Sequence, residues 1–377
     1  MTKRGYGSER QGQCRRNGWC GVTRTIDGLV ARGEVGGRTV QIVESGEVEC
    51  HGYEPAPLAD GHVRVRTIRS AISPGTEMTF YGKDASNVYF HKRWDEELRL
   101  FVAGAPSIDY PFTFGYRASG EVVETRSADV AIGHRVYGNW RHTELTAMPA
   151  QKAIDQSLPD GLSWDDGVDL AQMGPICVNA VAFAEGEHGA GPAVVFGAGP
   201  VGLITAQVAA AEGAKVFVVD RLPSRLEVAR GLGLDIIEAA DGVDVAATLK
   251  RQLGSEGIAV AWECTGSTVA LHEAIRVVKR QGLVLAVGFY QGEGRGLLLG
   301  DEFHHNGIRV TCAQIGNIHR THSWSSLRQR IIELAVTGSV KLGELPRDTL
   351  PVERAAEAFA ALTRPAEVLQ SALRYDA

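Results

Sequence analysis

The chain has 377 residues, a formal net charge of −6 and a hydrophobic content of 44%, so it is long enough for two or three domains with cores of their own. The acidic balance gives no electrostatic case for nucleic acid or an anionic membrane surface, and no apolar run approaches the ~20 residues that span a bilayer. The six cysteines are scattered without a CxxC pair, which argues against a disulfide framework or a structural zinc site and favours a reducing cytoplasm.

Residues 1–34 differ from the rest of the chain. The segment up to Arg24 carries six Lys or Arg residues against one acid, Glu9, and lacks apolar periodicity. We therefore expect a disordered tail. It has no hydrophobic stretch of a secretory signal, and a transit peptide, the alternative, would also be amphipathic.

Residues 35–163 are predicted to form a β-rich domain. Short runs alternate at period two between glycine, proline and polar turns, which is typical of short strands in a partly open barrel. The predicted strands are residues 39–43, 61–67, 120–124 and 133–137. Residues 83–110 are polar and irregular, and we expect them to shape a pocket.

From residue 164 the pattern changes to alternating helices and strands. We predict helices at 165–184, 269–279, 323–336 and 352–362, and strands at 193–196, 215–219, 235–237, 260–263, 283–288 and 369–374. This alternation indicates an α/β fold with a doubly wound parallel sheet.

A glycine turn connects the first strand of that sheet to a helix. Gly197 permits the tight turn, Gly199 lets the backbone approach a pyrophosphate, and Gly202 lets the helix pack closely on the strand. The N-terminus of the helix offers free N–H groups and a positive dipole end to the phosphates. Asp220 ends the next strand, near the expected ~20 residues downstream, so we predict a dinucleotide-binding fold.

The same acid predicts NAD(H) in preference to NADP(H). A carboxylate at Asp220 accepts hydrogen bonds from a free 2′-hydroxyl and repels a 2′-phosphate. Arg221 and Arg225 are the counter-argument, because a guanidinium could turn toward a phosphate. We expect the carboxylate to dominate, since both arginines can point to solvent.

In the order of its motifs, the chain from residue 38 to 377 resembles the medium-chain dehydrogenase/reductase superfamily. The motifs are Pro74-Gly75-Thr76-Glu77, Gly115-Tyr116-Arg117, Gly133-His-Arg-Val136, the glycine turn, Glu263-Cys-Thr-Gly266, Val287-Gly288-Phe289 and Leu350-Pro-Val-Glu-Arg-Ala-Ala-Glu-Ala-Phe359. Within the superfamily it is similar to a branch that includes relatives of bacteriochlorophyllide dehydrogenase.

The resemblance implies a GroES-like β-rich catalytic domain, residues 35–163 and 314–377, with a Rossmann domain, residues 164–313, inserted. It also implies a homodimer and hydride transfer in a cleft between the domains. The residues expected at the cofactor are Gly197, Gly199, Pro200, Val201, Gly202, Asp220, Arg221, Arg225, Thr265, Val287, Gly288 and Phe289.

The departures from the family's zinc enzymes predict a site without metal. The places of the catalytic ligands hold Ser73–Pro74, Tyr116–Arg117 and Gln172–Met173, and the four-Cys structural lobe is absent. Zinc prefers thiolate, imidazole or carboxylate. A substituted site using Cys177 or His142 is the alternative, against a core cysteine and a solvated histidine.

Without zinc, Tyr116 and Thr76 are the candidate catalytic residues. Tyr116 takes the place of the lost imidazole and could donate a proton or a hydrogen bond, while Thr76 lies where the family often has a hydroxyl. Packing and turn capping are the structural alternatives. Arg117 is expected either to pair with Glu77 or to lie at the surface.

We therefore predict an NAD(H)-dependent, zinc-independent oxidoreductase that interconverts a secondary alcohol and a ketone on a small metabolite. One alternative is an NAD(P)H-dependent reductase of activated C=C bonds, similar to enone or quinone reductases. The other is a non-catalytic dinucleotide-binding protein. The sequence names neither the substrate nor the direction of reaction.

Overall fold

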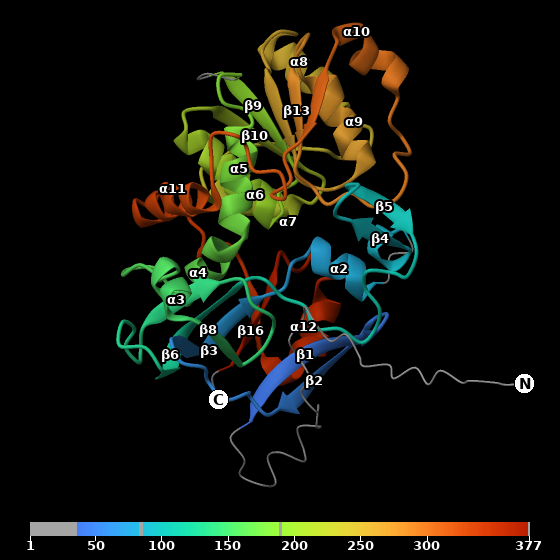
Figure 1. Cartoon of the computed structure of the whole chain (residues 1–377). Coiled ribbons are helices and arrows are strands. Elements are labelled where there is room, and N and C mark those ends of the chain that lie inside the picture. Colours follow the sequence, from blue (N-terminus) through green and yellow to red (C-terminus); the bar gives the residue numbers. More distant parts are fainter. Residues whose placement is uncertain (1–35, 83–85, 188–190, 376–377) are drawn as a thin grey trace, which may run out of the picture.

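The computed structural model describes residues 36–375 except 83–85 and 188–190, so the predicted tail lies outside the described part of the chain. Two lobes stand one above the other in Figure 1. The lower lobe contains the N-terminal strands and the last strands of the chain, and the upper lobe contains the middle of the sequence.

The upper lobe is built on six parallel strands in the order β11-β10-β9-β12-β13-β14. Counted along the chain this is 3-2-1-4-5-6, the doubly wound order of a Rossmann fold, which confirms the predicted fold class. The strands are β9 (Pro192–Phe196), β10 (Lys215–Asp220), β11 (Asp235–Glu238), β12 (Val260–Glu263), β13 (Leu283–Ala286) and β14 (Arg309–Cys312).

Helices cover both faces of this sheet, as β9 illustrates. Its sequence is apolar throughout because alternate side chains enter two different cores. Val195 packs in one buried cluster, while Val194 and Phe196 pack in the other. The helices of the lobe are α5 (Met173–Ala182), α6 (Pro200–Ala211), α7 (Pro223–Gly231), α8 (Val245–Leu253), α9 (Thr268–Val277) and α10 (His304–Asn306).

The lower lobe has a sheet in the order β15-β16-β3-β6-β7, with β8 also paired to β3. Two antiparallel hairpins, β1-β2 and β4-β5, complete its strands. These strands are β1 (Gly37–Glu44), β2 (Glu47–Tyr53), β3 (His62–Ala71), β4 (Lys92–Asp95), β5 (Leu100–Ala103), β6 (Ala118–Thr125), β7 (Arg135–Gly138), β8 (Leu145–Pro149), β15 (Asp348–Pro351) and β16 (Ser371–Arg374). The remaining α-helices are α2 (Thr76–Tyr81), α3 (Ala150–Asp155), α4 (Trp164–Ala171), α11 (Trp324–Val336) and α12 (Ala355–Ala361).

The C-terminal segment returns to the first lobe, because β16 pairs with β3 in an antiparallel ladder. Between the lobes, α4 packs on β6 and β7, whereas α11 packs on α5. The exact domain boundaries that the sequence suggested, at residues 163/164 and 313/314, stay proposals.

Two local predictions differ from the structure. The single helix expected at 165–184 is two helices, α4 and α5, because Gln172 adopts φ −143° and ψ −44° between them. Periodicity located the buried face, including Leu170 and Cys177, but not this break. Residues 83–110, expected to be irregular, contain a 3₁₀ turn (Val88–Phe90) and the β4-β5 hairpin.

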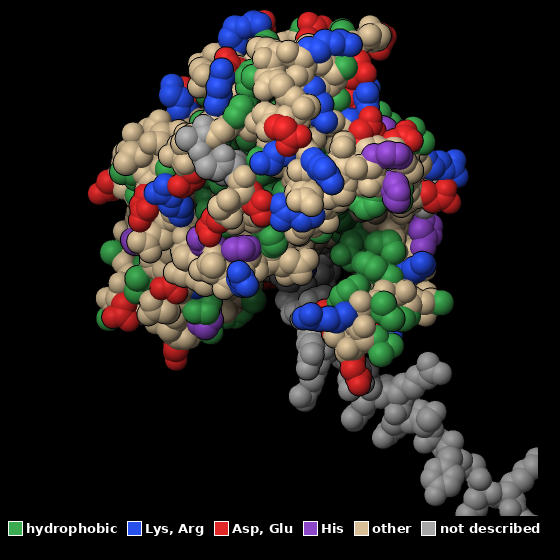
Figure 2. Space-filling view, turned by 90° about the horizontal axis from the view of Figure 1, so that it is seen from above, with side chains coloured by type: hydrophobic (Ala, Val, Ile, Leu, Met, Phe, Trp, Pro, Cys, Tyr) green, Lys and Arg blue, Asp and Glu red, His purple; other side chains and the backbone are tan. Residues whose placement is uncertain are grey.

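Charges of both signs are intermixed on the face in Figure 2, without a large field of one sign. A mixed surface of this kind has no electrostatic footprint for nucleic acid on that face. None of the described helices is long and apolar enough to cross a bilayer.

A buried ionic network ties α4 to the sheet of the lower lobe. Arg117, which is 0% exposed, donates to the Oδ1 of Asp169 and to Gln370 at 3.2 Å. The other oxygen of Asp169 accepts from Arg347 at 2.7 Å. Neither expectation for Arg117 is correct: its partner is not Glu77, and it is not at the surface. Both partners of the carboxylate are cations, so removal of the acid leaves buried positive charge uncompensated.

We predict that Asp169→Ala lowers the free energy of unfolding by about 3–5 kcal/mol, the cost of breaking a buried ion pair. The matched control is Asp165→Ala on the same helix, whose carboxylate pairs with Arg347 but is 37% exposed; its loss should cost about 1 kcal/mol or less. Urea denaturation of both variants gives the comparison. Equal losses would contradict the assignment of the network as a buried anchor.

Candidate dinucleotide and catalytic site

The glycine turn between β9 and α6 has the geometry that its glycines predict. Gly197 has φ +101°, and a Cβ at Gly202 would lie 1.7 Å from the carbonyl oxygen of Gly197. At Gly199 the nearest atom to such a Cβ is 3.7 Å away, on the Arg225 guanidinium. Gly199 and Pro200 begin α6 without a side-chain cap, so the first N–H groups of the helix remain for a ligand.

Asp220 orients this turn from the end of β10. Its Oδ2 accepts from the backbone N–H of Ala198 at 2.7 Å, and its Oδ1 accepts from Leu222 at 2.9 Å. A carboxylate has about four acceptor positions, so it retains capacity for hydroxyl groups. The acid therefore holds the glycine turn and presents a negative charge beside it.

The two arginines after Asp220 take different positions. Arg221 is exposed. Arg225 is half-buried, donates from Nε to the carbonyl of Pro365 at 3.1 Å and lies over the glycine turn. Burial lowers the pKa of its guanidinium, with Asp220 opposing that shift. The expectation that both arginines point to solvent is wrong for Arg225, which faces the turn.

A buried carboxylate, Glu263, organises the next two loops at the carboxyl edge of the sheet. Its Oε1 accepts from the backbone of Thr265 at 2.7 Å and from that side chain. Its Oε2 accepts from Gly266 at 3.1 Å and from the hydroxyl of Tyr290. Burial raises the pKa of Glu263, with its four hydrogen bonds opposing that rise.

Three other cofactor candidates follow β13, and Val201 lies in the first turn of α6. Val287 and Gly288 donate their backbone N–H groups to the carbonyl of Glu263 at 2.8 and 3.0 Å. Phe289 is half-buried, and Val201 accepts at its carbonyl from the Cys177 thiol at 3.3 Å. The sequence motifs located this edge, but nothing local in them indicated that one acid would join both loops.

The loop after β13 also contacts the lower lobe. Gln291 Oε1 accepts from the backbone of Val88 at 3.3 Å. The carboxyl edge of the nucleotide-binding sheet is therefore in direct contact with residues near α2, the helix that carries Thr76. This contact places the β13 loop against part of the segment 83–110.

Tyr116 and Thr76 lie close together in the lower lobe. The side chains of Ser73 and Thr76 lie near the Tyr116 hydroxyl, and both act to lower its pKa. The backbone of Thr76 donates to Ser73 Oγ at 3.3 Å. Burial, together with the nearby negative charge of Glu77, raises the pKa of Tyr116, so its hydroxyl stays protonated and able to donate.

Behind this group lies a buried pair that the sequence did not predict. His142 Nε2 and Glu77 Oε2 are 2.8 Å apart, with side-chain exposures of 1% and 0%. Glu77 Oε1 accepts from the backbone of Ser73 at 3.0 Å, and His142 Nδ1 lies 2.7 Å from Ser70 Oγ. The expectation of a solvated His142 is wrong. No local signal could have found this pair, since its members are 65 positions apart.

The hydrogen bonds continue past His142. Ser70 Oγ lies 3.0 Å from the hydroxyl of Tyr375. Every partner is satisfied when His142 donates from Nε2 to Glu77 and accepts at Nδ1 from Ser70, which in turn accepts from Tyr375. A connected chain of polar groups therefore runs from Ser73, near Tyr116, into the interior.

The donor chemistry at the zinc-ligand positions does not fit zinc. Gln172, at the third position, accepts from Asn139, whose own oxygen accepts from Arg328 at 3.3 Å. Cys177 is a buried core residue. Among the described residues, two groups bring three His, Cys, Asp or Glu side chains within reach of one ion, and neither contains Cys177 or His142. Hydroxyl and amide groups are poor zinc ligands.

The molecule has two lobes, and one of them combines a doubly wound sheet with a glycine turn and a terminal acid. This is the arrangement of a nucleotide-dependent oxidoreductase of the alcohol dehydrogenase type. Comparison with known proteins agrees. The family model described as zinc-binding dehydrogenase matches residues 200–333. D-guloside 3-dehydrogenase from Escherichia coli K12 is 27% identical over 308 residues, which cover 78% of this chain and 86% of that protein.

Solved structures show the same fold. The crystal structure of 2R,3R-butanediol dehydrogenase from Bacillus subtilis has a TM-score of 0.71 at 19% identity and covers 90% of this chain and 100% of that one. A zinc-binding dehydrogenase from Sinorhizobium meliloti bound to NADP has a TM-score of 0.68 at 17% identity, with coverage of 90% and 100%. The resemblance to the medium-chain dehydrogenase/reductase superfamily that the motifs predicted is confirmed, and the chain is an oxidoreductase.

Proposed function

We propose that this protein is an NAD(H)-dependent, zinc-independent oxidoreductase that interconverts a secondary alcohol and a ketone on a small hydroxylated metabolite. One observation carries the proposal. Ser73 and Tyr116 occupy positions where zinc enzymes of the superfamily hold metal ligands, and Thr76 and Glu77 lie near the Tyr116 hydroxyl. The relative named for a sugar derivative, D-guloside 3-dehydrogenase, supports a polyhydroxylated substrate.

The residues of the upper lobe fit a nicotinamide dinucleotide. The free N–H groups of α6 would bind the pyrophosphate, with Arg225 above the turn, and Asp220 would accept from the adenosine ribose. Thr265, Val287 and the residues that follow would line the nicotinamide side. When bound, this cofactor supplies or accepts the hydride.

The residues of the lower lobe would manage the carbonyl oxygen and its proton. The neutral hydroxyl of Tyr116 is a donor suited to the oxygen of a ketone, where negative charge develops during reduction. Ser73 and Thr76 lie near that hydroxyl, and Glu77 accepts from the backbone N–H of Ser73 and so fixes the turn that carries both residues. Tyr116 and Thr76 are thus the proposed catalytic pair, with Glu77 and His142 as positioning residues.

Assembly and location are part of the same proposal. A homodimer rests on the resemblance to the superfamily alone. A reducing cytoplasm is supported by the cysteines of the described chain, all of which are free: Cys50, Cys177, Cys264 and Cys312.

For cofactor choice, we predict that the wild-type protein binds NADH about a hundredfold or more tighter than NADPH, since a like-charge pair costs several kcal/mol. Asp220→Asn keeps a side-chain acceptor for the turn and removes the charge, so the preference should shrink. Asp220→Ala tests the complete loss of the carboxylate. Fluorescence titration with both reduced cofactors measures the ratio.

Arg221→Ala is the control for that titration, because this arginine is exposed and the geometry gives Arg225 the place at the turn. It should leave the ratio nearly unchanged. Tighter binding of NADPH by the wild-type protein, or an unchanged ratio in both Asp220 variants, would rule out the assignment.

For the chemistry, we predict that Tyr116→Phe lowers kcat/KM of ketone reduction about a hundredfold or more while cofactor affinity stays constant. The protonated hydroxyl is the donor, so in the wild-type protein kcat/KM should stay level up to about pH 10 and fall only as pH rises through the raised pKa of Tyr116. The Phe variant should lack that fall.

Tyr81→Phe is the control in the same lobe, since that ring packs on Phe359; its activity should match the wild type. The assay follows both products, so that consumption of an enone without carbonyl reduction identifies the alternative C=C reductase. Binding of dinucleotide without turnover of any alcohol, ketone or enone would instead support a non-catalytic protein.

For the metal, we predict that exhaustive chelation leaves kcat and KM unchanged, because the groups at the zinc positions are hydroxyl, amide and guanidinium. Dialysis against a strong chelator, followed by elemental analysis and assay, tests this. Loss of activity together with about one zinc per chain, restored by zinc alone, would overturn the zinc-independent assignment.

A further inference from the structure

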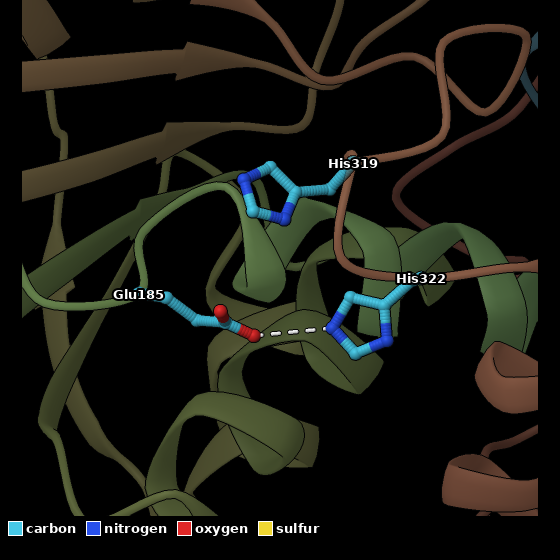
Figure 3. A group of neighbouring side chains, drawn as sticks. All are labelled: Glu185, His319 and His322. Carbon is cyan, nitrogen blue, oxygen red and sulfur yellow. Dashed lines mark hydrogen bonds and ion pairs between the residues drawn. The ribbon is translucent and has the colours of Figure 1, made fainter.

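Three metal-binding side chains meet beside α5, on segments that take no part in the proposed catalytic site. Glu185 follows α5, and His319 and His322 lie between β14 and α11. One potential ligand atom of each lies within 4.8 Å of the other two, and Figure 3 shows the three side chains facing one another. The fold has thus brought together residues up to 137 positions apart.

The spacing is close to that of a zinc site. Ligand bonds of about 2.0–2.2 Å in a tetrahedron put neighbouring ligand atoms about 3.3–3.5 Å apart. His322 Nε2 and Glu185 Oε1 are already 3.1 Å apart. His319 brings a ring nitrogen within 4.8 Å of both other ligand atoms, and two imidazoles with one carboxylate are ligands that zinc accepts readily.

The backbone that carries the histidines is anchored to α5 from beneath. Asn179 is 0% exposed and accepts at Oδ1 from the backbone of His319 at 2.9 Å. Its amide nitrogen donates to the carbonyls of Ala313 and Asn317 at 3.4 and 3.3 Å. One turn further along, Phe183 packs edge-on against the His319 ring, with centroids 4.9 Å apart. The ligand positions are therefore held by the interior of the protein.

Each histidine also has an outer partner for its ring. His319 Nδ1 lies 2.8 Å from Thr321 Oγ1, and His322 Nδ1 lies 3.4 Å from Ser326 Oγ. Such partners orient the ring of a metal-bound histidine and select its tautomer. A second cluster, His272 with Asp301 and Glu302, also meets the distance criterion. There Glu302 already pairs with Arg276, and a guanidinium beside the site disfavours a cation.

We propose that Glu185, His319 and His322 bind a divalent transition-metal ion, Zn²⁺ in the first place, with water completing its coordination. The metal joins the end of α5 to the segment that leaves β14, so its binding stabilises the folded state. The site is independent of the proposed function and of activity.

The experiment is calorimetric titration of Zn²⁺ into chelator-treated, tag-free protein, repeated with Co²⁺ to record the visible absorption of a bound ion. The wild-type protein should bind one Zn²⁺ per chain and melt at a higher temperature with it. His319→Ala and Glu185→Gln should each weaken binding by about tenfold or more and abolish the thermal shift, with circular dichroism confirming that both variants are folded.

Two matched control variants test whether the ion binds at Glu185, His319 and His322. Glu187→Gln removes an acid two positions from Glu185 that pairs with Arg309, and His272→Ala removes a histidine from the second cluster. Both should bind Zn²⁺ as the wild type does. Absence of binding to the wild-type protein, or equal binding by all variants, overturns the proposal. Neither result bears on zinc-independent catalysis, which chelation and Tyr116→Phe test separately.

Discussion

A Cβ atom at position 202 would lie 1.7 Å from the carbonyl oxygen of Gly197. Only a glycine at position 202 therefore lets the first turn of α6 pack against the end of β9. That approach determines where the amino end of α6 lies. The helix is buried along most of its length, and it therefore cannot shift outward without exposing apolar surface, at about 25 cal/mol per Å². The position of the phosphate-binding N–H groups thus follows from the packing of the core.

Buried or partly buried acids then hold the loops next to the amino end of α6 through hydrogen bonds. Asp220 accepts from two amides of the glycine turn and its own loop, Glu263 from the loops after β12 and β13, and Glu77 from the turn before α2. A buried carboxylate must accept hydrogen bonds or pair with a cation, since burying an unpaired charge destabilises the fold. Each acid therefore dictates a single loop conformation. The binding elements are fixed in this way before any ligand arrives, which lowers the cost of binding.

The sequence predicted the parts of this arrangement that depend on short-range patterns. The β9 run, the glycine spacing and the distance to Asp220 lie within one βαβ unit, and the structure has them as expected. The partners of buried charges were not predictable in this way. Arg117 meets Asp169 across 52 positions and Gln370 across 253, and such pairing depends on how β6, α4 and β16 pack.

The proposed tyrosine site and a zinc site differ in the direction of reaction that they favour. Zinc lowers the pKa of a bound hydroxyl and so assists alcohol oxidation. Burial and Glu77 instead raise the pKa of Tyr116, which keeps its proton and makes it a poor base for an alcohol. In oxidation, the alcohol's proton would need another acceptor, and Glu77, which is linked to His142 and close enough to raise the pKa of Tyr116, is a carboxylate in this region. A neutral donor at the carbonyl oxygen requires no such acceptor in reduction, so the proposed chemistry favours the ketone as substrate.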